Sequence, residues 1–89
     1  MKKPRQLERI VKGFANHRRI EILILLWRQP ELSVAEIAEN LNINFKTASE
    51  HIRRLAQAEL IMKRNENNFV RHALTPLGSS ILKFLRILE

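Results

Sequence analysis

The stretch that decides the fold runs from Ser33 to Leu60 and reads SVAEIAENLNINFKTASEHIRRLAQAEL. Its apolar residues recur at helical spacing in two blocks, which predicts two short amphipathic helices. The first helix follows Ser33, which can cap its start, and the second follows Asn44, which stands at the equivalent position. Only Asn42-Ile43-Asn44 joins the two helices, and a connection of this length is typical of a helix-turn-helix.

The second of these helices carries polar and basic residues on its outward face, as does a recognition helix that enters the major groove of DNA. Lys46 lies near the end that enters the groove, so it is a candidate for reading bases, whereas Arg53 and Arg54 are candidates for phosphate contacts. The alternative for these cations is an ordinary solvated helix face. The residues expected at DNA from this segment are Asn44, Phe45, Lys46, Thr47, Ser49, Glu50, Arg53 and Arg54.

Three residues of the same helix have competing interpretations. A carboxylate beside phosphates weakens binding, so Glu50 either accepts from a cytosine amine or pairs with Arg53 or Arg54 within the helix; we favour the intrahelical pair. Phe45 can press on a thymine methyl group or pack on the preceding turn. His51 flanks the buried face, and we expect it at the edge of the core.

The segments before this motif predict a loose basic arm over residues 1–5 and two more helices. Gln6–Ala15 has apolar residues on one face. His17–Arg28 follows Asn16 as a candidate cap, and its middle is apolar almost all round. A helix of that kind is buried on several sides, so we expect it at the centre of the domain.

The segments after the motif predict a β-hairpin and a last helix. Ile61–Arg64 and Phe69–Leu74 are rich in β-branched and apolar residues, and Asn65-Glu66-Asn67-Asn68 between them favours a four-residue loop. Thr75-Pro76 restarts a helix, with Thr75 as cap and Pro76 at the first helical position. The hairpin cations would reach the flanking minor groove or backbone of DNA, with a solvated hairpin as the alternative; they are Lys63, Arg64 and Arg71.

The predicted fold class is therefore mainly α with a β-hairpin, in the order α-α-α-α-β-β-α. A hairpin directly after a recognition helix makes this a winged helix-turn-helix. With 89 residues, the chain has room for one core, so residues 1–89 are expected to form a single domain.

The charge balance points to a polyanionic partner. The formal net charge is +7 and no aspartate occurs, which favours nucleic acid first and an acidic membrane surface second. The alternative is a merely basic, soluble protein. Ile20–Trp27 is too short to span a bilayer, and Pro4-Arg5-Gln6 stands where the apolar part of a signal peptide would begin, so we expect a cytoplasmic protein.

The sequence offers no catalytic constellation. It has no cysteine, only two glycines, no nucleophile and base at a useful spacing and no clustered carboxylates. We therefore expect no enzyme activity, no cofactor and no metal site.

Three blocks resemble the ArsR-type winged-helix repressors. Arg19-Ile20-Glu21-Ile22-Leu23 resembles the R-x-x-I-L of the second helix in that family, and residues 32–38 resemble its metal-sensing helix E-L-C-V-C-D-L-A. Residues 47–55 resemble the T-V-S-x-H-L-x-x-L of its recognition helix. Thr75-Pro76-Leu77-Gly78 also resembles the start of the last helix in MarR- and PadR-type regulators.

The chain departs from the resembled family at its metal sites. Ser33 and Ala35 stand where a metal sensor would carry cysteines, and the last helix offers only Glu89 toward a second site, so metal sensing is not expected. Glu59 stands in place of the usual glycine after the recognition helix, so we expect that helix to end without the left-handed cap that glycine favours.

The resemblance implies a homodimer that represses transcription by occluding a promoter. We expect it to bind an inverted-repeat operator in double-stranded DNA, and no residue points to a small-molecule effector. A winged-helix protein-interaction module and a nonspecific nucleic-acid-binding protein are the alternatives. In the resembled family the first and last helices form the dimer interface, although both apolar stripes could also pack within one protomer. The stripe residues are Leu7, Ile10, Val11, Phe14, Leu77, Ile81, Phe84, Leu85 and Leu88.

Overall fold

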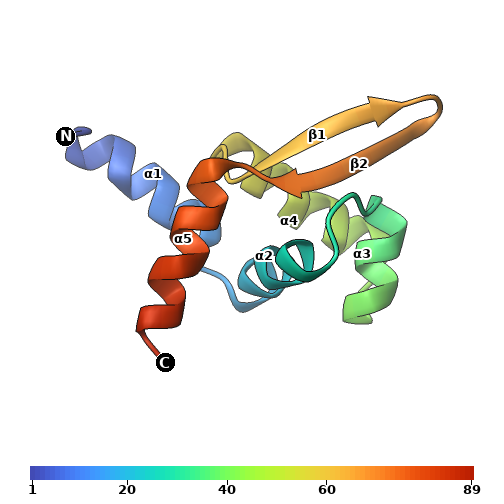
Figure 1. The fold of residues 1–89 in the computed structure, drawn as a ribbon, viewed down its shortest axis with the longest axis horizontal. Helices are drawn as coiled ribbons and strands as arrows, with labels where there is room; N and C mark the ends of the chain where they lie inside the picture. Colours follow the sequence, from blue (N-terminus) through green and yellow to red (C-terminus); the bar gives the residue numbers. More distant parts are fainter.

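The computed structural model describes residues 1–89 as five helices and a two-stranded antiparallel hairpin (Figure 1). The first and last helices lie together on one side of the molecule, and the hairpin extends from the other side. This arrangement confirms the winged helix-turn-helix and the expected order of elements. The elements are α1 (Pro4–Phe14), α2 (His17–Arg28), α3 (Val34–Leu41), α4 (Phe45–Gln57), β1 (Ile61–Glu66), β2 (Phe69–Leu74) and α5 (Pro76–Ile87).

The predicted N-terminal caps are confirmed at four helices. Asn16, Ser33, Asn44 and Thr75 each accept a hydrogen bond from a backbone N–H in the first turn of the helix that follows. Each cap satisfies donors that have no partner inside the helix. These short polar side chains therefore fix where α2, α3, α4 and α5 begin.

The start of α1 corrects the expectation of a loose arm over residues 1–5. The helix begins at Pro4, because proline suits the first helical position and needs no hydrogen bond there. The Gln6 side chain accepts from the backbone N–H of Lys3 at 3.0 Å, which closes the first turn. Arg5 therefore lies on a helix rather than in an arm.

The end of α4 also differs from the expectation. Glu59 adopts a left-handed backbone with φ of 62°, although it has a side chain. The N–H groups of Glu59 and Leu60 reach back to the carbonyls of Ala56 and Leu55, each at 3.0 Å, which closes the helix as a left-handed cap does. The Thr75 hydroxyl donates to the Glu59 carbonyl at 2.6 Å and helps to hold this conformation.

The core forms between α2 and the inner faces of α3 and α4. Ile22 and Leu23 of α2 are fully buried, as are Ile52 and Leu55 of α4, within 1% exposure. α2 contacts α3, α4, α5 and β2, which confirms its central place. One side of α2 is nevertheless open, because Trp27 is 55% exposed.

The hairpin is longer and its loop tighter than expected. The strands pair from Ile61 with Leu74 to Glu66 with Phe69, so only Asn67 and Asn68 remain in the loop. The predicted four-residue loop is therefore wrong. Asn67 has φ of 56°, and asparagine tolerates the left-handed backbone that a two-residue turn requires.

Candidate nucleic-acid interface

The first half of α4 presents a continuous polar surface to solvent. Asn44 caps the helix by accepting from the Thr47 N–H at 2.7 Å, so the side chains that follow project from a fixed start. Lys46 and Ser49 are exposed, and Phe45 is 58% exposed. The opposite face carries the buried Ala48, Ile52 and Leu55, which hold the helix against the core.

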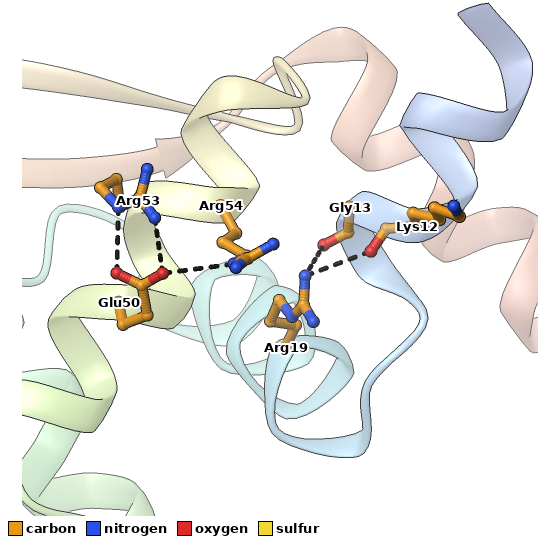
Figure 2. A network of polar contacts seen from close by, with 6 residues as sticks. All are labelled: Lys12, Gly13, Arg19, Glu50, Arg53 and Arg54. Atoms are coloured by element: carbon orange, nitrogen blue, oxygen red, sulfur yellow. Dashed lines mark hydrogen bonds and ion pairs between the residues drawn. The ribbon is translucent and has the colours of Figure 1, made fainter. Parts of the chain in front are cut away.

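A three-residue ion network follows one turn further along α4 (Figure 2). Glu50 accepts two hydrogen bonds from Arg53, at 2.6 and 3.0 Å, and one from Arg54 at 3.2 Å. The structure thus confirms the intrahelical pair that we favoured for Glu50. Hydrogen bonding from Arg53, followed by that from Arg54, lowers the pKa of Glu50 to about 2, so the carboxylate stays ionised.

The same network orients the two arginines differently. Arg53 turns both Nε and one terminal nitrogen to Glu50, whereas Arg54 uses Nε alone. In Figure 2 the Arg54 side chain extends toward Arg19 and the end of α1. Because these groups are about half exposed, the ion pairs contribute little to stability and can exchange for other anions.

His51 lies between the outward and buried faces of α4. It is half-buried, as expected for a residue at the edge of the core. Burial lowers its pKa, and the neighbouring positive charge of Arg19 acts in the same direction. His51 is therefore neutral near pH 7 and does not add to the basic surface.

The hairpin cations are tied to the body of the protein to different extents. Arg64 pairs with Glu31 at 2.9 Å and with Glu66 at 3.4 Å. Arg71 donates to the backbone carbonyl of Glu31 at 3.0 Å. Lys63 is exposed and takes part in none of the ion pairs of the structure. The structure thus brings Arg64 and Arg71 to one acidic site and leaves Lys63 apart.

A buried histidine attaches the hairpin to the loop between α2 and α3. His72 is 1% exposed, and its backbone N–H donates to the Leu32 carbonyl at 3.0 Å. Its ring Nδ1 lies 2.8 Å from the same oxygen, so Nδ1 carries the proton. Burial lowers the pKa of His72, because the charged ring would lose its hydration.

Sequence reasoning missed a group of cations beside the second half of α4. Arg5, Arg9 and Lys12 of α1 and Arg19 of α2 gather near Arg54. Their common position could not be read from spacing alone, because it depends on how α1 crosses α4. The only local signal was the i, i+4 repeat of Arg5 and Arg9 on the polar face of α1.

The residues expected at a dimer interface divide into two groups. Leu7, Val11, Phe84 and Leu88 are between 40% and 67% exposed, and the neighbouring Ile87 is 77% exposed. Phe14 packs in the core of the protomer, and this burial corrects its assignment to the interface. The remaining stripe residues are partly buried against the same core: Ile10, Leu77, Ile81 and Leu85.

The structure contains neither a metal-binding cluster nor a helix that could span a membrane. No group of three or more His, Cys, Asp or Glu side chains is arranged to hold a metal ion. None of the helices has both the length and the apolar character that crossing a bilayer requires.

The match to a known family extends from the start of α2 through the helix-turn-helix to the turn of the hairpin. A sequence model of the MarR family matches residues 15–68. The chain belongs to the MarR family. This family and the fold are those of DNA-binding transcriptional regulators.

Solved structures similar to this MarR-family chain are also regulators. A transcriptional regulator HlyU from Vibrio vulnificus CMCP6 is 31% identical with a TM-score of 0.76, over 92% of this chain and 85% of that one. HlyU from Vibrio cholerae N16961 is 29% identical with a TM-score of 0.83, over 99% and 97%.

A third similar structure is the homodimeric winged helix-turn-helix DNA-binding domain of Mb0332 from Mycobacterium bovis, a possible ArsR-family regulator. It is 28% identical with a TM-score of 0.84, over 93% of this chain and 77% of that one. No curated protein sequence matches the chain.

Proposed function

We propose that this MarR-family protein is a homodimeric, sequence-specific repressor that binds an inverted-repeat operator and senses no metal. The observation that carries the proposal is the exposed first half of α4, which is polar, capped and held rigidly by a buried opposite face. As a regulator that acts on DNA, the protein is expected in the cytoplasm.

Within the proposed complex, α4 enters the major groove by its N-terminal end. Lys46 reads base edges, and Ser49 donates to a base or phosphate one turn later. Arg53 and Arg54 bind phosphates, exchanging part of their pairing with Glu50 for contacts with DNA. Phe45 lies at the entry point, where its ring can contact a thymine methyl group.

The hairpin supplies the second proposed contact with the duplex. Lys63 needs no rearrangement to meet a phosphate, because no carboxylate pairs with it. Arg64 and Arg71 must leave Glu31 or Glu66 or share them with DNA. These exposed ion pairs contribute about 0–1 kcal/mol each, so the exchange costs little.

The proposed dimer would use the exposed apolar edge formed by α1 and α5. Leu7 and Val11 of α1, together with Phe84, Ile87 and Leu88 of α5, leave apolar surface in water that a second copy could cover. Support comes from the homodimeric Mb0332 domain, which shares the fold. A two-fold dimer would present two α4 helices about one turn of DNA apart, which matches an inverted repeat.

The narrower proposal is that the chain is ArsR-like in its mode of action and lacks metal control. Ser33 caps α3 through its hydroxyl, so this residue has a structural role where the resembled sensors hold a thiolate. The similarity to Mb0332, a possible ArsR-family regulator, supports the ArsR-like assignment.

Selection of genomic fragments by the purified protein tests the proposal, with excess nonspecific competitor at physiological salt. Enrichment of a short inverted repeat, bound by two copies in analytical ultracentrifugation, is the expected outcome. Binding without enrichment would indicate a nonspecific nucleic-acid-binding protein. No binding to any DNA would refute the proposal and favour a protein-interaction module.

A further inference from the structure

A basic groove of about 540 Å³ lies between α1, the start of α2 and the second half of α4. It is strongly unbalanced in charge, with five cations against one carboxylate, and no apolar residue other than Ala58 lines it. Such an excess attracts an anion by simple electrostatics. The charged residues of this basic groove are Arg5, Glu8, Arg9, Lys12, Arg19 and Arg54.

We propose that the basic groove binds a backbone phosphate of the operator DNA, on the flank of α4 opposite the hairpin. The inference rests on the proposed function and extends it, because it adds α1 to the DNA-binding surface. In Figure 1 α1 and the hairpin lie on opposite sides of the molecule. A helix in the major groove has a sugar-phosphate backbone on each flank, so the hairpin faces one strand and the basic groove the other.

Arg19 of the basic groove uses only part of its hydrogen-bonding capacity within the protein. Arg19 donates through one terminal nitrogen to the carbonyls of Lys12 and Gly13, each at 3.1 Å, which caps the end of α1. Its Nε is buried and has no hydrogen-bond partner. Burial lowers the pKa of Arg19, and the positive charge of Arg54 lowers it further. A bound phosphate would relieve this repulsion.

The cations at the rim of the groove make few contacts within the protein. Arg5 and Arg9 take part in no ion pair or side-chain hydrogen bond of the structure. They lie one turn apart on the polar face of α1, so their guanidinium groups can approach the same phosphate. Lys12 pairs with Glu8 at 3.6 Å, and both side chains are more than half exposed. Glu8 is thus the only group in the groove that opposes an anion.

The groove is continuous with the proposed recognition surface through Arg54. This side chain contacts Glu50 on the outward side of α4 and also lines the basic groove. Figure 2 shows it lying between Glu50 and Arg19. A phosphate beside the second half of α4 would therefore lie near both Arg54 and the α1 cations.

Two variants with opposite expected effects test the proposal, each measured as DNA affinity against salt concentration. Arg9→Gln should weaken binding roughly three- to tenfold and reduce the log-log salt slope by about one for each protomer. Glu8→Gln should strengthen binding and steepen the slope, because it removes the opposing carboxylate. Neither change touches the core, since both side chains are exposed.

Arg28→Gln is the matched control, because Arg28 is exposed at the end of α2 and lies outside the basic groove. The probes are the selected operator fragment and a random-sequence duplex of equal length. Arg9→Gln and Glu8→Gln should each change the affinity for both duplexes by the same factor, because a phosphate contact does not depend on base sequence. With Arg9→Gln, ethylation interference should detect one fewer contacted phosphate in each half-site than with the unmodified protein. With Arg28→Gln, the number of contacted phosphates should not change.

The outcomes separate this inference from the proposed function. If Arg9→Gln and Glu8→Gln behave as Arg28→Gln does while Lys46→Ala destroys operator selectivity, α1 does not contact DNA and only the groove proposal fails. Loss of all DNA binding in the unmodified protein would refute both. Thermal stabilisation by inorganic pyrophosphate that needs Arg9, with an unchanged DNA salt slope, would assign the groove to a free ligand and overturn the DNA assignment.

Discussion

The proposed recognition helix α4 and the hairpin are positioned by different forces. α4 is held by Ala48, Ile52 and Leu55, all buried to 1% exposure or less, so its outward face moves only with the core. The hairpin buries little of β1 beyond Ile61. Its polar contacts with the body include the hydrogen bond of His72 to Leu32, the ion pair of Arg64 with Glu31 and the hydrogen bond from Arg71 to the Glu31 carbonyl. Apolar packing is insensitive to salt, whereas exposed ion pairs weaken as salt rises. We infer a rigid helix beside an adjustable hairpin.

The largest expected effect follows from removing the apolar anchor of α4. Ile52→Ala should lower the free energy of unfolding by about 2–5 kcal/mol, because a cavity forms in a closely packed core. Val70→Ala is the matched change in the hairpin, where the side chain is 41% exposed, and it should cost less than about 0.5 kcal/mol. Chemical denaturation followed by circular dichroism measures both. Similar losses for the two variants would show that the hairpin is as tightly packed as the helix.

The next effect concerns DNA selectivity on the rigid helix. Lys46→Ala should reduce discrimination between operator and random DNA by about 1–3 kcal/mol, because a base contact is lost. Arg54→Ala should instead weaken both DNAs alike and lower the salt slope. Fluorescence anisotropy over a range of salt concentrations distinguishes these patterns. Unchanged binding in both variants would show that α4 does not enter the major groove of DNA.

Acid should loosen the hairpin before it affects α4. Because the folded pKa of His72 lies below the ordinary value of 6.5, the unfolded state binds protons first as the pH falls. This contribution to stability is therefore complete above about pH 6.5 and decreases below it. The backbone N–H of Glu31 donates to the His72 carbonyl, and that of His72 donates to the Leu32 carbonyl. The protection factors of these two amides, corrected for the pH dependence of intrinsic exchange, should fall over that range before those of α4 do.

The pKa of His51 is lowered as well, so the two histidines must be separated. His51→Gln leaves the hydrogen bonds between His72 and the loop before α3 unchanged. This variant should therefore still lose protection at the Glu31 amide early as the pH falls. If this variant abolishes the acid effect on the hairpin, His51 rather than His72 is responsible.

The smallest expected effect comes from freeing one hairpin cation. Glu31→Gln removes the 2.9 Å partner of Arg64 and should change stability by less than about 1 kcal/mol. DNA affinity should rise, because Glu66 is then the only carboxylate that competes with phosphate for Arg64. Glu39→Gln, which removes an exposed carboxylate of α3 that pairs with no cation, is the control for net charge. Equal gains in both variants would mean that the Glu31 pair does not restrain the hairpin.

The local features of the fold were predictable because they depend on neighbours in the sequence. Asn16, Ser33, Asn44 and Thr75 cap helices whose first turns they immediately precede. The Glu50 pairs with Arg53 and Arg54 were predictable for the same reason, since residues three and four apart meet on a helix.

At Glu59 and Phe14 the structure differs from the expectation because a distant contact decides a local conformation. Glu59 was expected to avoid a left-handed backbone, yet the Thr75 hydroxyl, 16 residues away, helps to hold it there. Phe14 was assigned to an outer stripe because its spacing fits, but α1 turns that residue into the core. The sequence predicts a four-residue hairpin loop where the structure has two, because periodicity does not reveal how far two strands continue to pair.

The sequence by itself determined the order of elements, the starts of α2, α3, α4 and α5 and the polar outward face of α4, because hydrophobic period and capping act within one or two turns. Only the tertiary structure decided that Arg64 pairs with Glu31, 33 residues away, and that Arg19 and the α1 cations meet Arg54. The α1 cations meet Arg54 because α1 approaches α4 closely at Gly13, where a Cβ atom would collide with Ala58. The spacing of residues along the chain does not predict how two helices cross.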